Sequence, residues 1–312
     1  MLQYLIILLD DTSVSYCHYE NKKTARKLIS IPDLEAGILF AMKENLMIQF
    51  VYPQYDLPKE YLFVIETIDH NKIMPYSGTD ENADVIVLDG WDNFPKKTDI
   101  PIILRTEKND FFSNYKELIP LLKEVKRLNI VITNIETFKE NDFTNYESAL
   151  SELKNAVNEQ YVNGVFPQLN ILSDRIMLDK MNNCNAGVEN ITLAPNGKFY
   201  ICPAFYLEDE NDSIGDLCAG MDIKNKQLYK ISYAPICRVC DAYQCKRCVW
   251  LSRKTTLEVN TPSHEQCVVS HIERNVSREL LTKLQSAEIF KDKNEIKAID
   301  YLDPFDVATK NL

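Results

Sequence analysis

The sequence predicts an α/β protein, with a partial (β/α) barrel-like N-terminal domain followed by a small, cysteine-rich α+β C-terminal domain. Up to about residue 178, short apolar runs alternate with longer segments of helical periodicity, and this succession implies a largely parallel sheet. From Cys184 onward, cysteines, turns and short strands replace that pattern. The length of 312 residues favours two domains. We therefore expect a barrel-like domain over 1–178, a cysteine-rich domain over 179–275, and a helix with a tail over 276–312.

The predicted strands are apolar runs, several of them rich in Val and Ile, bounded by Asp, Asn or Pro. They cover residues 4–9, 47–51, 61–65, 85–88, 102–104, 130–133 and 169–172. Apolar residues at helical spacing predict helices over 33–44, 114–128, 146–160 and 270–286. The helix over 114–128 has the clearest pattern, with Asn114 as its candidate N-cap. The tight-turn pair Asn196-Gly197 predicts a hairpin between residues 191–194 and 198–201.

Net charge and hydropathy argue against nucleic-acid binding, membrane binding and a targeting segment. The net charge of -11 argues against nucleic acid or an anionic membrane as a main partner, because either would need a basic footprint. The apolar run over residues 5–9 is short, lacks a basic flank and leads directly into Asp10 and Asp11. It therefore predicts a buried first strand rather than a signal peptide or a membrane span. We expect a cytoplasmic protein.

The distribution of the nine cysteines is uneven. Only Cys17 lies within the first 183 residues. The others fall within 84 positions and are Cys184, Cys202, Cys218, Cys237, Cys240, Cys245, Cys248 and Cys267. In a reducing cytoplasm, cysteines at this density indicate a metal site more often than a disulfide framework.

Cysteine spacing discriminates between the candidate metals. The run Cys237-x2-Cys240-x4-Cys245-x2-Cys248 places two Cys-x2-Cys pairs only four residues apart. A zinc ribbon usually separates its two pairs by about 15–20 residues. The compact run is closer to ferredoxin-type ligation, in which neighbouring cysteines can serve different clusters. Zinc remains the alternative metal.

Seven of these cysteines follow an order that resembles the SPASM domain, the C-terminal extension of radical SAM peptide and protein maturases. The family pattern is Cys-x9-15-Gly-x4-Cys, a gap, Cys-x2-Cys-x5-Cys-x3-Cys, a gap and Cys. Cys184-x12-Gly197-x4-Cys202 matches the first part in full, whereas the middle run is one residue short at two spacings. Residues 191–197 and 214–217 also look like segments of such domains. The resemblance covers roughly residues 180–270, so the cysteine-rich domain is expected to be SPASM-like.

The resemblance implies two [4Fe-4S] clusters with interleaved ligands. The first would be held by Cys184, Cys202 and Cys248, and the second by Cys237, Cys240, Cys245 and Cys267. The first cluster then lacks a fourth ligand, unless one iron is open or binds substrate. Cys218 would supply the missing count, since eight cysteines make two sets of four, but it could equally be a small buried residue.

The loop after the first strand departs from the radical SAM pattern. Such enzymes carry Cys-x3-Cys-x2-Cys there, but with Cys17 as the middle ligand the partners fall on Ser13 and Glu20. The Gly-Gly-Glu type segment is also absent, so the N-terminal domain looks like a pseudo-radical-SAM form and no S-adenosylmethionine is expected. We interpret Cys17 as vestigial, because adjacent Cys17 and His18 on an extended segment would point apart. His271, like the other histidines, is expected to be a surface or core residue.

Across the whole chain, including the opening Leu-Asp-Asp-Thr-Ser-Val-Ser-Tyr-Cys-His-Tyr, the sequence looks most like the maturases of CXXX-repeat peptides. This resemblance implies a cysteine-containing, ribosomally made precursor peptide and a partner radical SAM maturase. We expect a cluster-bearing subunit of a ribosomal-peptide (RiPP) maturation system rather than an autonomous radical SAM enzyme. It would bind the precursor peptide, relay electrons for the partner, or both. The alternative is a non-catalytic recruitment scaffold stabilised by zinc.

Overall fold

The computed structural model describes residues 1–78, 82–95 and 97–310. The predicted α/β class is confirmed, with parallel strands forming most of the sheet. The chain divides into two compact units, each built from two separate segments: Met1–Val87 with Cys184–Tyr233, and Leu88–Asn183 with Ala234–Leu312. The domains over 1–178, 179–275 and 276–312 follow a different division and stay a prediction. Among the described helices, none is long and apolar enough to cross a membrane.

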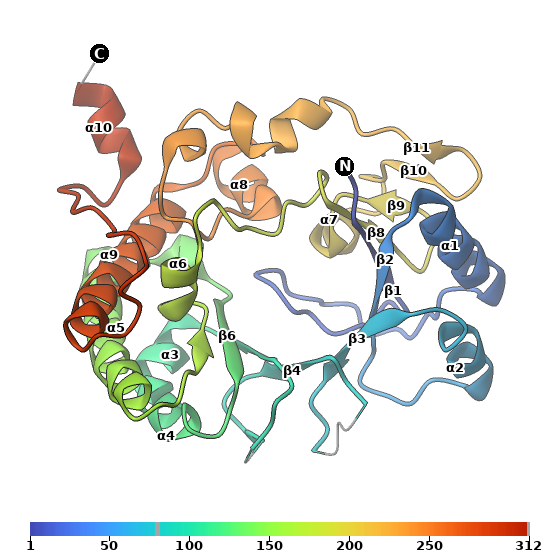
Figure 1. Ribbon diagram of the computed structural model, residues 1–312. Helices are drawn as coiled ribbons and strands as arrows, with labels where there is room; N and C mark the ends of the chain where they lie inside the picture. Colours follow the sequence, from blue (N-terminus) through green and yellow to red (C-terminus); the bar gives the residue numbers. More distant parts are fainter. Residues whose placement is uncertain (79–81, 96, 311–312) are drawn as a thin grey trace. The chain divides into compact units, whose positions relative to one another are not determined.

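The first unit is built around strand β1 (Tyr4–Leu8), which Figure 1 shows between β2 and β8. The buried side chains of β1 belong to the core of this unit. β1 pairs in parallel with β2 (Met47–Val51) on one side and with β8 (Asn190–Leu193) on the other. β2 continues in parallel to β3 (His70–Pro75), which pairs with the first residues of β4 (Val85–Asp89). The predicted hairpin is confirmed, because β9 (Phe199–Tyr200) returns antiparallel to β8 after Gly197 at φ 74°.

Helix α1 (Ile31–Glu44) covers this sheet and confirms the helix predicted over 33–44. Ser30 caps its first turn by accepting a hydrogen bond from the Asp33 N–H. Its buried face includes Gly37, and a Cβ at that position would overlap the side chain of Leu193. A glycine is therefore needed where α1 approaches β8.

The strand predicted over 61–65 is wrong. These residues belong to helix α2 (Lys59–Ile65), in which Tyr61, Val64 and Ile65 are buried while Leu62 and Phe63 are exposed. That spacing is helical rather than alternating. The Tyr61 hydroxyl also donates to the Ile29 carbonyl at 2.7 Å, which holds the helix against the core. A five-residue apolar run does not distinguish a strand from a buried helical face.

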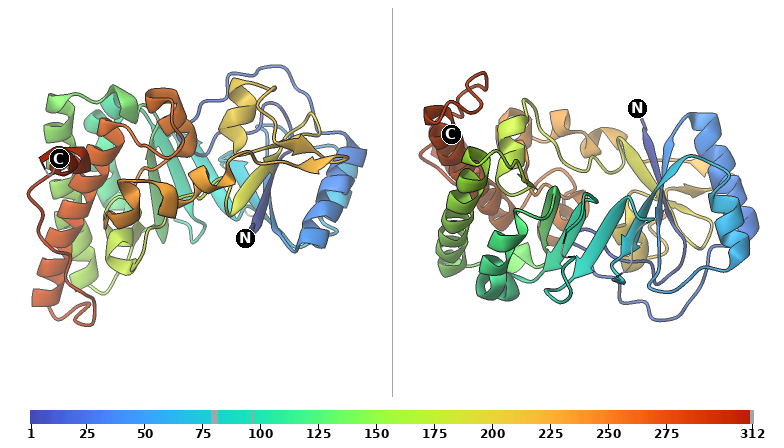
Figure 2. Two further views of the ribbon diagram at one scale, coloured as in Figure 1. Left: turned by 90° about the horizontal axis from the view of Figure 1, so that it is seen from above. Right: turned by 60° about the horizontal axis from the view of Figure 1, so that its bottom comes forward.

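The second unit contains the parallel strands β5 (Ile102–Thr106), β6 (Arg127–Ile132) and the two-residue β7 (Gln168–Leu169). Two long helices, α5 (Glu140–Val162) and α9 (His264–Ser286), lie side by side in every view (Figures 1 and 2). Between them, the Tyr146 hydroxyl donates to Glu273 Oε1 at 2.6 Å. The helices predicted over 146–160 and 270–286 are confirmed.

The helix predicted over 114–128 is largely wrong. The chain forms α3 (Lys108–Asn114), a 3-10 turn over Tyr115–Glu117 and the short α4 (Leu118–Leu121), and then enters β6 at Arg127. Pro120 has no N–H to donate, so it is tolerated only in the first turn of a helix, which is its place in α4. Asn114 makes no side-chain capping bond.

Tyr206 of helix α7 (Pro203–Glu208) supplies the first testable prediction. Its hydroxyl donates to Oδ1 of Asp11, and both side chains are buried in the first unit. Tyr206→Phe removes the donor and leaves the carboxylate partly unsatisfied. We expect the free energy of unfolding to fall by about 1–3 kcal/mol in urea titrations. Tyr233→Phe, at an exposed position, is the control, and an unchanged midpoint for Tyr206→Phe would contradict the expectation.

Candidate metal centre

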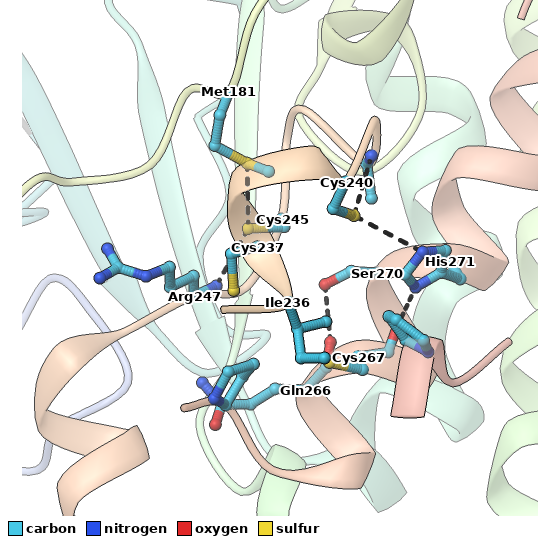
Figure 3. A pocket seen from close by; sticks show the side chains of 13 residues that line it. Met181, Ile236, Cys237, Cys240, Cys245, Arg247, Gln266, Cys267, Ser270 and His271 are labelled. Atoms are coloured by element: carbon cyan, nitrogen blue, oxygen red, sulfur yellow. Dashed lines mark hydrogen bonds between the residues drawn. The ribbon is translucent and has the colours of Figure 1, made fainter. Parts of the chain in front are cut away.

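Four of the predicted ligands line one pocket in the second unit (Figure 3). They are Cys237, Cys240, Cys245 and Cys267. The pocket encloses about 330 Å³ of empty space, part of which is open to solvent. These four are the residues that the SPASM resemblance assigns to a single cluster. The structure therefore brings this set together, and their role as ligands stays a prediction.

Two local structures position the four thiols. Cys237 and Cys240 lie at the start and the end of a 3-10 turn, and Cys267 lies in the first turn of α9. A capping box fixes that turn, since Ser263 accepts from the Gln266 N–H and the Gln266 side chain accepts from the Ser263 N–H. Gln266 Nε2 also donates to the Lys246 carbonyl at 2.9 Å. The start of α9 and the loop that carries Cys245 are thus held together.

Helix α9 presents three residues to the cysteine loop at positions i, i+4 and i+7. Cys267 lines the pocket, and His271 places Nε2 at 3.6 Å from Cys240 Sγ. His271 Nδ1 lies 2.9 Å from the Cys267 carbonyl, which can only accept, so Nδ1 carries the hydrogen. Arg274 donates from Nε and Nη2 to both oxygens of Asp241, at 2.8 and 2.6 Å. Positions with this spacing share one face of a helix.

Asp241, His271 and Arg274 were not identified from the sequence as parts of a site. His271 is a core residue, as one of the expected alternatives had it, but it also contacts a thiol. The available signal was the helical spacing from Cys267, together with an acidic residue directly after Cys240. Neither is informative until α9 is known to pack on the loop.

A further pair of contacts ties the segment between Cys245 and Cys248 to the helices. Lys246 Nζ lies 3.2 Å from Glu273 Oε2 on α9, and the other carboxyl oxygen accepts from Tyr146. Burial raises the pKa of Glu273, while the Lys246 ammonium and the Tyr146 hydroxyl lower it. These contacts hold the segment that carries Lys246 against α9 and α5.

The last part of the chain covers one side of the pocket. Pro304 lines it directly, and the ring of Tyr301 lies 5.5 Å from that of His271. Asp303 is buried and pairs with His264 Nδ1 at 2.6 Å. These contacts hold the tail against the start of α9, so the tail forms part of the pocket wall.

Burial suppresses ionisation of the thiols. It raises the pKa of Cys237 to about 12 and that of Cys240 to about 11, and it also raises the pKa values of Cys245 and Cys267. Arg247 opposes the shift at Cys237 and Cys245. Without metal the thiols are therefore neutral at pH 7, and a bound metal must displace their protons.

The donor set has the chemistry that an iron–sulfur cluster needs, since all four side chains are thiols. Within the described part of the chain, no group of three or more His, Cys, Asp or Glu side chains is placed to hold one metal ion. A tetrahedral zinc site, with Zn–S bonds of about 2.3 Å, would need its sulfur ligands less than about 4 Å apart. A cluster distributes four thiolates over several irons and tolerates wider spacing. The four thiols around this pocket match the number of protein ligands that one four-iron cluster takes.

The remaining predicted ligands do not line this pocket. Cys184 is exposed and Cys202, the N-cap of α7, is half-buried; both belong to the first unit. Cys248 is half-buried at the N-cap of α8 (Val249–Thr256) in the second unit. Cys218 is exposed between β10 (Gly215–Asp216) and β11 (Gly220–Met221), where its N–H donates to Asp216 Oδ1 at 2.8 Å.

The loop after β1 uses serine where a radical SAM motif would use cysteine. Ser13 is buried, donates to the Val51 carbonyl at 2.8 Å and accepts from the Asp10 N–H at 3.1 Å. Glu20 is exposed, and Cys17 is half-buried. The Ser13 side chain is therefore committed to the backbone rather than presented to a ligand.

The raised thiol pKa values predict how pH affects the metal-free protein. Because the folded values exceed the ordinary value of 9.0, the stabilisation is complete below pH 9 and is lost as the pH rises through about 11–12. We expect the free energy of unfolding of reduced, metal-free protein, measured by urea titration, to fall above pH 9, by on the order of 1–2 kcal/mol per thiol near pH 10.5. Over the same pH range, the free energy of unfolding of the double variant Cys237→Ala/Cys240→Ala should fall less. An equal decline would show that these two thiols do not cause the pH dependence.

Comparison with known proteins identifies the fold. No family model and no curated protein matches the chain. Among solved structures, native anSMEcpe with bound AdoMet and Cp18Cys peptide is 13% identical, with a TM-score of 0.64 over 92% of this chain and 100% of that one. Hexahistidine-tagged anSMEcpe with bound AdoMet is 16% identical, with a TM-score of 0.63 over 93% and 97% of the two chains. These are structures of an anaerobic sulfatase-maturating radical SAM/SPASM enzyme. The predicted resemblance to that family is confirmed at the level of the fold.

Proposed function

We propose that this chain is an iron–sulfur subunit of a ribosomal-peptide maturation system. It binds a cysteine-containing precursor peptide, relays electrons for a partner radical SAM enzyme, or both. The observation that carries the proposal is the set of four thiols around one pocket, in a fold shared with an enzyme whose structures hold AdoMet and a peptide. We place the protein in the cytoplasm, where reducing conditions keep such thiols available for metal.

The loop after β1 supports a role that depends on a partner. Reductive cleavage of S-adenosylmethionine by such an enzyme needs three thiolates in this loop, and the described loop offers only that of Cys17. Ser13 is committed to the backbone, and Glu20 is an exposed carboxylate. We infer that the radical arises on the partner enzyme and that this chain contributes its C-terminal site.

The residues that line the pocket have different roles in this proposal. Cys237, Cys240, Cys245 and Cys267 would hold a cluster, which when bound supplies one-electron transfer. Arg247 places a buried positive charge near the thiolates and so favours their anionic form. The tail at Pro304 limits solvent access on one side. Partial exclusion of water of this kind influences a cluster's reduction potential.

Metal analysis of anaerobically purified protein tests the proposal. We expect about eight iron and eight sulfide per chain, the content of two four-iron clusters. With S-adenosylmethionine and a strong reductant, the protein alone should form no 5′-deoxyadenosine, whereas a partner radical SAM enzyme should form it under the same conditions. Zinc without sulfide would instead support the recruitment scaffold. Cleavage by this chain alone would refute the dependence on a partner.

A further inference from the structure

A second pocket lies within the second unit, and it shares no lining residue with the pocket of the four thiols. It encloses about 1000 Å³ of empty space, part of which is open to solvent. Its lining comes from the first residues of β6 and β7, the end of α5 and the loop after it, α6 (Ser173–Met177) with the segment that follows, and the turn after α9. A pocket of this size can hold a ligand, and its lining residues indicate the ligand's chemistry.

Aromatic and other apolar side chains supply much of this lining. Tyr161 is buried, and its ring packs against those of Phe166 and Phe290, with centroids 5.2 and 5.8 Å away. Phe166 and Met177 also line the pocket, yet each is 54% exposed. Large apolar side chains that are grouped and exposed around a hollow indicate a binding surface, whereas scattered ones do not.

The position of Phe290 is maintained against a backbone preference. Its φ is 56°, in the left-handed region that a bulky side chain rarely adopts. The Phe290 carbonyl accepts from the Lys293 N–H at 3.1 Å and from Gln285 Nε2 at 3.4 Å. These bonds keep the ring beside Tyr161, and residues in such conformations are concentrated at ligand sites.

The polar groups of the second pocket select a neutral ligand. Arg127 donates to both carboxyl oxygens of Asp174, at 2.6 and 3.3 Å, and to Gln168 Oε1 at 2.8 Å. The positive and negative charges of the lining therefore neutralise each other. Gln168 keeps its amide NH₂ group for a ligand, while Asn182 donates Nδ2 to Gln244 and keeps its carbonyl oxygen. One amide donor and one amide acceptor complement the C=O and N–H of a peptide backbone.

The edge of the sheet at this pocket is closed to an added strand. β7 is the last strand of the sheet on this side. The Ser173 hydroxyl accepts from the Leu169 N–H at 2.7 Å and donates to the Leu169 carbonyl at 3.1 Å. A peptide therefore cannot bind by extending the sheet. It has to be held by a side chain in the pocket and by the amides beside that side chain.

The segment after α6 connects the second pocket to the cysteine loop. Asn182 lines the second pocket, and its N–H donates to the Tyr243 carbonyl at 2.7 Å. Met181, the preceding residue, lines the pocket of the four thiols and places Sδ 3.4 Å from Cys245 Sγ (Figure 3). A ligand in the second pocket would thus contact the segment that packs on the cysteine loop.

We propose that the second pocket binds an uncharged stretch of the precursor peptide through one aromatic or aliphatic side chain. The ring of Phe166, together with Phe290 and Met177, contacts that side chain, and Gln168 and Asn182 bind the backbone on either side of it. The inference rests on the proposed function and gives its peptide a docking site beside the candidate metal centre.

NMR of the full chain, labelled with carbon-13 at its methionine methyl groups, tests the proposal. The probe is a blocked tripeptide with phenylalanine between two serines, added to protein purified anaerobically and to protein freed of metal. We expect the signal of Met177 to shift in both samples. The signals of Met42 and Met47, exposed residues of the first unit, should stay in place. An unmoved Met177 signal, or equal shifts of all three, would overturn the proposal.

Two further probes identify the class of ligand. A blocked tripeptide of three serines should leave Met177 unshifted at the same concentration. Benzyl alcohol, which has the ring without the backbone, should shift Met177 less than the phenylalanine peptide does. An equal shift with the serine peptide would remove the role of the apolar side chain, and an equal shift with benzyl alcohol would assign the pocket to a small apolar molecule. Either result would overturn the proposal.

Phe166→Ser should weaken binding of the phenylalanine peptide about fivefold, because it removes an aromatic contact. Phe63→Ser is the matched control, since Phe63 is exposed in the first unit and should leave the affinity unchanged. Parental affinity in Phe166→Ser would contradict the assignment.

The metal-free sample separates this inference from the proposed function. If the parent protein binds no iron, the cluster of the proposed function is refuted, and the Met177 shift still decides whether the second pocket binds the peptide. If iron is bound and Met177 does not respond, only the inference fails.

Discussion

Replacing Cys267 with serine is expected to remove about half of the iron that the protein binds, or about four of eight atoms per chain. Cys267 is buried and lines the pocket together with three other thiols. Serine is a much poorer ligand for iron, and in Cys267→Ser the remaining three thiols are left with an incomplete set. Iron and sulfide analysis of anaerobically prepared protein measures the loss, and EPR of the reduced protein shows which cluster is affected.

Cys218→Ser is the matched control, because Cys218 is exposed and lies outside the pocket. It should retain the iron that the four-thiol pocket holds. Circular dichroism should report the same helix content for both variants, so that loss of metal is distinguished from loss of fold. Full iron in Cys267→Ser would show that the four-thiol pocket does not hold the second cluster.

Replacing Arg274 with methionine should give the second large effect, on stability. Arg274 is 1% exposed and holds both oxygens of Asp241, the residue that follows Cys240. Breaking a buried ion pair by removing one partner costs about 3–5 kcal/mol. Asp241 keeps partial access to water and a second cation, Arg175, at 3.5 Å, so we expect the lower end of that range, about 3 kcal/mol.

Urea titration of the metal-free protein measures this effect without a contribution from metal binding. Arg278→Met is the control, since Arg278 lies one turn further along α9 and is half-buried. Combining Arg274→Met with Asp241→Asn should cost less than the sum of the single changes, which assigns the loss to this pair. An additive result, or an equal loss in Arg278→Met, would show that the pair does not fix the cysteine loop.

The order of elements was predictable from the sequence wherever the signal was local. β1 and β2 are apolar runs with polar ends, and the β8–β9 hairpin follows from Asn196-Gly197. The failures have non-local causes. Residues 61–65 become a helix because one of its faces packs on the core, and Arg127 begins a strand because β5 and β7 are available to pair with β6.

The residues of the candidate site were likewise only partly predictable from the sequence. The SPASM resemblance assigned to one cluster the four thiols that the structure gathers into one pocket. It did not find His271 or Arg274, because their roles depend on α9 packing against a loop about thirty residues earlier in the chain.

The discontinuous make-up of the two units constrains how the protein matures during its synthesis. The first unit needs residues up to Tyr233, and the second needs the segment that begins at Ala234. At about 5–20 residues per second, a ribosome finishes that last segment only several seconds after residue 233. The pocket gains all four of its thiols, and Pro304, while this segment is made. Under the proposed function, iron would be delivered to the complete pocket only after this segment is made, and a cell that makes this protein faster than it supplies iron would accumulate the folded, metal-free form.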